Sequence, residues 1–178
     1  MDSQTCSNLM IDINNILFQP MKVKDTNDFI LGDMFYDELK YSAIIKNIQM
    51  RIGNLWEVIA CKYFNWTKVS SGIDLIDINR KLAIELKNAD NTDNSSSRAR
   101  NCQKLLDFKQ LHPEYRLLYV CINNRNTNES QSYFMENGIH FVSGEYALDI
   151  LFGDMSTEVI NILRSCVWNY KNVMLKNE

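Results

Sequence analysis

The sequence has no long hydrophobic run. Its apolar stretches, of which Leu117–Ile122 is among the longest, have the length of a β-strand, far short of the roughly 20 residues that cross a bilayer. The first residues also lack a basic segment ahead of an apolar one, which is the pattern of a signal peptide. We therefore expect no membrane partner and a soluble, intracellular protein of the cytoplasm.

Histidines, paired cysteines and glycine-rich motifs are scarce as well. The two histidines, His112 and His140, lie far apart, and the five cysteines show no Cys-x-x-Cys spacing. This pattern argues against a zinc site and a Cys/His catalytic pair, and it indicates reduced thiols that are mostly buried. No Gly-x-Gly-x-x-Gly or Walker motif occurs among the six glycines, so we do not expect nucleotide binding through a glycine-rich loop.

The composition is that of an ordinary globular protein, 46% hydrophobic and 23% charged. A length of 178 residues predicts a single domain, 1–178, in which residues 1–50 form an N-terminal helical region without a legible role. The net charge is −3, yet residues 79–125 hold nine basic and five acidic side chains. A basic centre fits a groove for nucleic acid, and it fits a solvated charged surface about as well.

Hydrophobic periodicity predicts helices that alternate with short strands. The helical patterns are Phe35–Phe64, with a break or kink at Gly53, Arg98–Leu111, Glu145–Phe152 and Ser156–Met174, and strand patterns cover Arg116–Ile122 and Ile139–Val142. Together with a hairpin between the first two helices, this order predicts an α/β fold: a small mixed central β-sheet flanked on both faces by helices.

The hairpin, residues 72–88, carries charged side chains where charge is costly. Its two short strands are joined by a tight turn at Asn79-Arg80. Because side chains alternate between the faces of a strand, the second strand has an apolar face and an opposite face that carries Glu85 and Lys87. If the strands pair through this turn, Asp74 lies near both of them.

Two carboxylates and an ammonium then converge on one patch, with the carboxylates in mid-sheet at one edge. Oxygen ligands of this kind suit Mg²⁺, and Lys87 could hold or deprotonate a water beside it. Asp77 points off the opposite face in the same register, so it is left out of the site. Glu57 falls in the first turn of a helical piece that begins at Asn54. There it is either a favourable charge near a helix N-terminus or a group beside the metal.

A polar run, residues 88–97, follows the hairpin and has almost nothing apolar to bury. By itself such a run is typical of a flexible loop. Here it leaves the strand directly at the predicted site, where its amides and hydroxyls could bind phosphates or base edges.

Asp74 and, after ten intervening residues, the Glu85-Leu-Lys87 motif lie on a hairpin that follows a helix with Glu57, and this arrangement resembles the PD-(D/E)xK nuclease superfamily. Ile73 stands where the superfamily name has proline, a departure that many members share. The longer run GIDLIDINRKLAIELKNADNTDNSSS, with the later LLYVCIN and HFVSGEYALDILFGD segments, is similar to type II restriction endonucleases that cut GGNCC. That similarity covers roughly residues 50–155, and the first 50 residues add nothing to it.

The resemblance implies a restriction-endonuclease-like fold and a Mg²⁺-dependent, sequence-specific endonuclease that hydrolyses double-stranded DNA as a homodimer. Asp74, Glu85 and the backbone carbonyl of Leu86 would hold Mg²⁺, and Lys87 would position the attacking water. Glu57 would reach a metal or its water shell. The expected DNA contacts are Asn88, Asn91, Thr92, Ser95, Ser96, Arg98 and Arg100.

Two alternatives remain open. The first is a nuclease of the same fold that acts in DNA repair, junction resolution or viral DNA processing. The second is a non-catalytic interaction module in which Glu85 and Lys87 form an exposed structural ion pair, although such pairs contribute little to stability.

Overall fold

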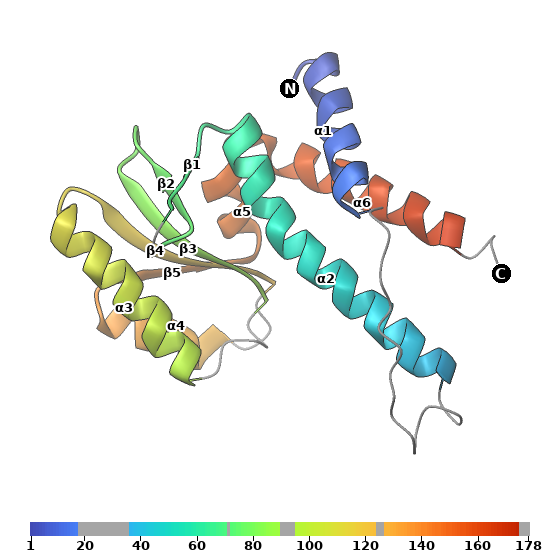
Figure 1. The fold of residues 1–178 in the computed structure, drawn as a ribbon. Coiled ribbons are helices and arrows are strands. Elements are labelled where there is room, and N and C mark those ends of the chain that lie inside the picture. Colours follow the sequence, from blue (N-terminus) through green and yellow to red (C-terminus); the bar gives the residue numbers. More distant parts are fainter. Residues whose placement is uncertain (18–35, 71, 90–94, 124–126, 175–178) are drawn as a thin grey trace. The chain divides into compact units, whose positions relative to one another are not determined.

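The computed structural model describes residues 1–17, 36–70, 72–89, 95–123 and 127–174 of the chain (Figure 1). Its contacts divide the chain into two compact units. The first consists of residues 1–55 and 160–178, and the second of residues 56–159. Within the described residues, no helix combines the length and the apolar character that a membrane crossing requires.

The first unit is helical. It contains α1 (Ser3–Leu17), most of α2 (Tyr36–Tyr63) and most of α6 (Ser156–Met174). The buried residues of α1, Leu9, Ile13 and Leu17, recur every fourth position and therefore share one face of the helix. The guanidinium of Arg51 donates a hydrogen bond to the carbonyl of Leu17 at 2.7 Å, which ties α2 to the end of α1.

Helix α2 runs for 28 residues and includes Gly53 in its interior. The predicted break at this glycine is therefore wrong. A glycine inside a helix costs about 0.5–1 kcal/mol, a penalty that a helix of this length tolerates. As a consequence, Glu57 lies well inside α2 and not in the first turn of a new helix, so the helix-dipole explanation for its charge is also wrong.

The second unit is built around a five-stranded sheet in the order β1-β2-β3-β4-β5. The strands are β1 (Thr67–Lys68), β2 (Leu75–Asp77), β3 (Leu82–Ala89), β4 (Arg116–Asn123) and β5 (His140–Ser143). The first three pair antiparallel, whereas β3, β4 and β5 pair parallel. The predicted mixed sheet is thus confirmed. The predicted mid-sheet position is confirmed for Glu85, because β3 is the central strand.

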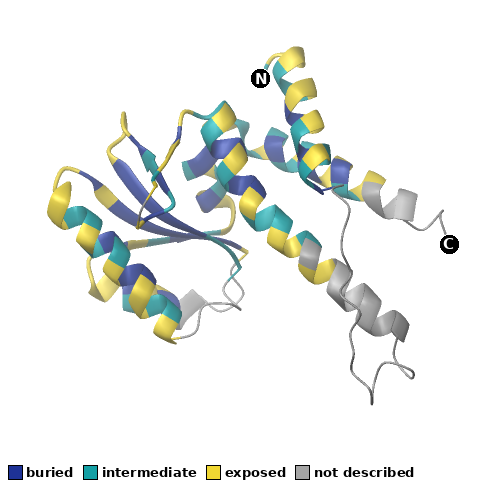
Figure 2. Ribbon diagram, in the orientation of Figure 1, coloured by how far each residue is buried: buried dark blue, intermediate teal, exposed yellow. Residues whose placement is uncertain are grey.

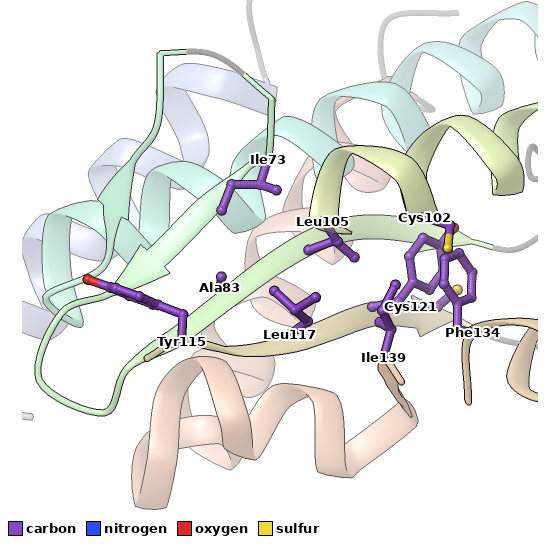
Figure 3. Close-up of a cluster of buried hydrophobic side chains, with 10 residues drawn as sticks. Ile73, Ala83, Cys102, Leu105, Tyr115, Leu117, Cys121, Phe134 and Ile139 are labelled. Atoms are coloured by element: carbon purple, nitrogen blue, oxygen red, sulfur yellow. The ribbon is translucent and has the colours of Figure 1, made fainter. Parts of the chain in front are cut away.

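One face of the sheet is covered by α3 (Ser95–Leu111) and α4 (Thr127–Glu136). Cys102 and Leu105 of α3 and Phe134 of α4 join Ala83 of β3 and alternate residues of β4 in one apolar cluster (Figure 3). The ring of Tyr119 stacks on Phe134 with centroids 3.8 Å apart. The predicted helix that began at Arg98 starts earlier, at Ser95.

The other face is covered by α5 (Gly144–Phe152), which packs against β4 and β5. The indole of Trp66 donates a hydrogen bond to the carbonyl of Leu151 at 2.9 Å, which attaches α5 to the segment before the hairpin. Figure 2 shows the resulting pattern, with buried strands in the centre and exposed residues on the outer sides of the helices. The predicted α/β fold, a mixed sheet flanked by helices, is confirmed.

Candidate active site

The hairpin pairs in the predicted register. Leu75 lies opposite Ile84 and Ile76 lies opposite Ala83, so the turn is centred on residues 79 and 80. Just before β2, the backbone N–H of Asp74 donates to the carbonyl of Ile84 at 3.1 Å. The Asp74 side chain in turn accepts a hydrogen bond at Oδ2 from the backbone N–H of Leu86, at 2.7 Å. These two bonds hold the Asp74 carboxylate against β3.

Glu85 lies in the middle of β3 and its exposed fraction is 0%. It is paired with Tyr119, so its side chain is on the sheet face that α3 and α4 cover. Its Oε1 atom accepts a hydrogen bond from the Lys87 ammonium at 2.7 Å. The same ammonium is 3.9 Å from Oδ2 of Asp74. The structure therefore brings together the three residues whose alternation pointed to a common patch: Asp74, Glu85 and Lys87.

A second ammonium, that of Lys104 on α3, lies 3.2 Å from the same Oε1 atom of Glu85. Sequence reasoning missed this residue, because the basic side chains of the helix do not follow one face. A weak signal was available: Lys104 directly precedes Leu105, which faces the apolar cluster, and follows the buried Asn101 by three positions. Lys104 therefore had to lie near the sheet-facing side of the helix.

The second carboxylate oxygen of Glu85, Oε2, is buried and has no hydrogen-bond partner in the described residues. Burial raises the pKa of Glu85, and the nearby Asp74 carboxylate raises it further, while Lys87 and Lys104 act in the opposite direction. The net effect is a pKa above its ordinary value, so the two ammoniums do not fully compensate the buried charge. The carboxylate can gain free energy from a further cation.

These residues fit a hard divalent cation. Asp74 and Glu85 offer carboxylate oxygens on one side of the sheet, and one oxygen of Glu85 makes no hydrogen bond to any described residue. Within the described ranges no three His, Cys, Asp or Glu side chains gather into a group. A metal here would hence have two carboxylates and complete its shell with backbone oxygen, water or phosphate. Mg²⁺ is commonly bound in this way, because it keeps several waters.

Glu57 is brought to a different partner. Its carboxylate forms an ion pair of 2.6 Å with the ammonium of Lys68 on β1. Lys68 has an exposed fraction of 68%, so this pair contributes little to stability. The hydrogen bond and charge of Glu57 raise the pKa of Lys68, and the charge of Asp74 adds to the effect. The ion pair with Lys68 does not test a role of Glu57 beside a metal, which stays a prediction.

The candidate DNA contacts fall into three groups. Oδ1 of Asn88 accepts hydrogen bonds from the Trp56 indole at 2.9 Å and from Asn123 at 3.1 Å, so this oxygen serves packing within the unit. Ser95, Ser96, Arg98 and Arg100 all lie in the first two turns of α3, where both serines and Arg100 are exposed and Arg98 is half-buried. Asn91 and Thr92 lie outside the described residues.

Comparison with known proteins supplies the family. The family model described as Eco47II restriction endonuclease matches residues 7–146, which is well over half of the chain. Comparison with curated proteins gives no match. Because the family match begins at residue 7, the expectation that the similarity starts near residue 50 is wrong. The matched range includes the whole cluster of Asp74, Glu85, Lys87 and Lys104. The chain therefore belongs to the Eco47II restriction endonuclease family.

Proposed function

We propose that the chain is a Mg²⁺-dependent type II restriction endonuclease that cuts double-stranded DNA at a specific sequence. Family membership makes it a restriction endonuclease with DNA as its partner. One observation carries the finer proposal: Glu85 is fully buried beside Asp74, and its Oε2 atom has no hydrogen-bond partner in the described part of the chain. A buried carboxylate with an unsatisfied oxygen is costly unless a cation completes it.

In this proposal Asp74, Glu85 and the backbone carbonyl of Leu86 hold Mg²⁺ beside the scissile phosphate. When bound, the metal neutralises charge that develops on the phosphoryl oxygens and lowers the pKa of a coordinated water. The hydrogen bond from the Leu86 N–H orients Asp74, because it holds Oδ2 against the strand. Glu85 cannot swing into solvent, since it is enclosed between the central strand and α3.

Lys87 has the role of orienting the attacking water and stabilising the phosphoryl oxygens. Its ammonium lies within 4 Å of a carboxylate oxygen of both Glu85 and Asp74, so it stands beside the position proposed for the metal. Its side chain is partly exposed, with 27% accessible, which leaves room for a phosphate to approach. A fixed positive charge at this position favours the transition state more than the ground state, because negative charge grows there.

DNA contacts are proposed at the start of α3. Ser95, Ser96 and Arg100 are exposed there, and the aligned peptide dipoles of a helix favour negative charge, such as that of a phosphate, near its N-terminus. Asn88 contributes through its amide nitrogen, because its oxygen is engaged with Trp56 and Asn123. The similarity of residues 72–97 to enzymes that cut GGNCC supports GGNCC as the class of DNA sequence that is recognised. A homodimer would match the symmetry of such a palindromic site.

The burial of Glu85 argues against the alternative of a non-catalytic interaction module. That alternative required an exposed ion pair between Glu85 and Lys87, whereas Glu85 is completely buried. A buried pair of this kind is weak evidence of stabilisation, because desolvation can exceed the attraction between the charges. A structural role therefore gives no reason for the unsatisfied oxygen of Glu85, whereas metal binding does.

The direct experiment incubates the purified full chain with plasmid DNA and Mg²⁺, repeats the reaction with EDTA, and sequences the ends. The expected result is a set of discrete fragments with common end sequences that EDTA abolishes. Nicks at branched or damaged DNA without a common sequence would instead indicate a repair or processing nuclease. The absence of metal-dependent cleavage would refute the proposal.

A further inference from the structure

Two ammoniums share one carboxylate oxygen in the candidate active site. Oε1 of Glu85 is 2.7 Å from Nζ of Lys87, on the same strand, and 3.2 Å from Nζ of Lys104, on α3. The proposed nuclease chemistry uses the first lysine and leaves the second without a task. Lys104 is 19 positions away from Glu85 in sequence, so its presence depends on the packing of α3 over the sheet.

The net charge of the cluster becomes positive when a metal is added. The carboxylates of Asp74 and Glu85 balance the ammoniums of Lys87 and Lys104, so without a metal the four groups are neutral together. A divalent cation on the two carboxylates brings the group to a net charge of +2. The positive charge of the metal then repels the two ammoniums that contact the Glu85 carboxylate. An excess of positive charge at this point favours the approach of a phosphate.

Lys104 is the more weakly held of the two lysines. Its contact with Glu85 is the longer one, and 34% of its side chain is accessible against 27% for Lys87. It also extends from the helix whose first turns carry Arg98 and Arg100, the proposed DNA contacts. A four-carbon side chain with an exposed end can change partners at little cost.

We propose that Lys104 is a phosphate-binding residue of this site: it neutralises Glu85 in the metal-free protein and binds a backbone phosphate of DNA once a metal occupies the carboxylates. This inference rests on the proposed function, because it needs the metal and the DNA that the nuclease would use. It adds a second lysine, from a helix, to the single lysine of the hairpin motif.

The test is the salt dependence of DNA binding by the full chain. Affinity for a short DNA duplex is measured at several KCl concentrations with Ca²⁺ in place of Mg²⁺, and a gel checks that the duplex stays intact. Each phosphate neutralised by a protein cation adds about 0.9 to the slope of log affinity against log salt. Lys104→Met should therefore lower the magnitude of the slope by about 0.9, and Lys104→Arg should retain the wild-type slope.

Lys109 provides the matched control, because it is a second lysine on α3. Its ammonium donates hydrogen bonds to the backbone carbonyls of Pro113 and Tyr115, so it is occupied within the protein. Lys109→Met removes the same charge from the same helix and should leave the slope unchanged. Circular dichroism of each variant checks that the helix is still formed.

A wild-type slope in Lys104→Met would overturn the inference, and so would an equal loss of slope in Lys109→Met. The result is separable from the fate of the proposed function. Metal-dependent cleavage by the wild type together with an unchanged slope in Lys104→Met refutes only the role of Lys104. A reduced slope without any cleavage by the wild type retains Lys104 as a phosphate ligand and refutes the nuclease chemistry.

Discussion

The two ends of the central hairpin each contain a buried carboxylate, and the two are treated in opposite ways. At the turn, Asp77 accepts a hydrogen bond from the backbone N–H of Arg80 at 2.8 Å and pairs with the Arg80 guanidinium. At the other end, Glu85 shares one oxygen between two lysines, and its other oxygen has no partner among the residues that the structure describes.

The pKa values of the two acids follow this difference. Burial raises the pKa of Asp77, but the hydrogen bonds and charge of Arg80 outweigh it, and the pKa ends below its ordinary value. Burial also raises the pKa of Glu85, and there its lysine partners do not compensate. Asp77 therefore stabilises the fold as an anion, whereas Glu85 costs stability as an anion. A protein retains such a cost where the charge has another use.

The largest effect is expected for cleavage itself. Glu85→Ala and Lys87→Ala should each abolish it, with losses of at least about 10²-fold, because each removes a group that stabilises transition-state charge. Circular dichroism should show that the fold survives. The reaction is measured on plasmid DNA with Mg²⁺, and full activity in either variant would contradict the assignment of the site.

At the turn, replacing the buried acid by alanine should affect the stability of the fold and not the cleavage reaction. Asp77→Ala removes the acceptor of the Arg80 N–H and the ion pair, so it should lower the free energy of unfolding by about 1–3 kcal/mol. The variant should still cleave DNA when folded, since Asp77 lies on the opposite face of the hairpin from Glu85. Urea unfolding measures the loss, and an unchanged midpoint would show that the turn does not depend on this residue.

Stabilisation of the protein by a metal should depend on Glu85 and not on Asp77. A ligand at ten times its dissociation constant raises the free energy of unfolding by about 1.4 kcal/mol. Mg²⁺ should therefore raise the melting temperature of the wild type and of Asp77→Ala alike, and EDTA should reverse the effect. Glu85→Gln should respond much less. An equal response in Glu85→Gln would mean that the metal binds elsewhere.

The smallest effect is a gain of stability on removing the charge of Glu85. With a folded pKa above its ordinary value of 4.5, Glu85 stabilises the fold fully below that pH and loses this contribution as pH rises through the folded pKa. Glu85→Gln should therefore be slightly more stable than the wild type at neutral pH. The two lysines tolerate the change, because both side chains reach water.

The contribution of Asp77 to stability depends on pH in the opposite direction. Its folded pKa lies below the ordinary value of 3.8, so its contribution is present above that pH and is lost as pH falls through the folded pKa. Denaturant unfolding at several pH values measures how the contribution of each acid to the free energy of unfolding depends on pH. A gain in Glu85→Gln that did not grow with pH would contradict the account of Glu85.

Much of the hairpin could be predicted because its geometry is local. The period of two in a strand puts Glu85 and Lys87 on one face, and a turn at residues 79 and 80 brings Asp74 opposite them. The same arithmetic excluded Asp77. The mixed α/β sheet also followed from the order of apolar patterns, since each such pattern must bury its face against another.

Other features could not be predicted, because they depend on segments that meet only in the folded chain. Gly53 was read as a break by local propensity, but α2 continues through it. Local pattern placed Glu57 at a helix start, whereas α2 continues through it and β1 supplies Lys68 as its ion-pair partner.

The sequence by itself determined which side chains share a face of the hairpin, because strand periodicity and a short turn leave no other register. The tertiary structure decided how those side chains are paired and how far they are buried. It made β3 the central strand, enclosed Glu85, and brought Lys104 to it from α3. Burial and long-range ion pairs arise from the packing of a helix on a sheet, which no local pattern encodes.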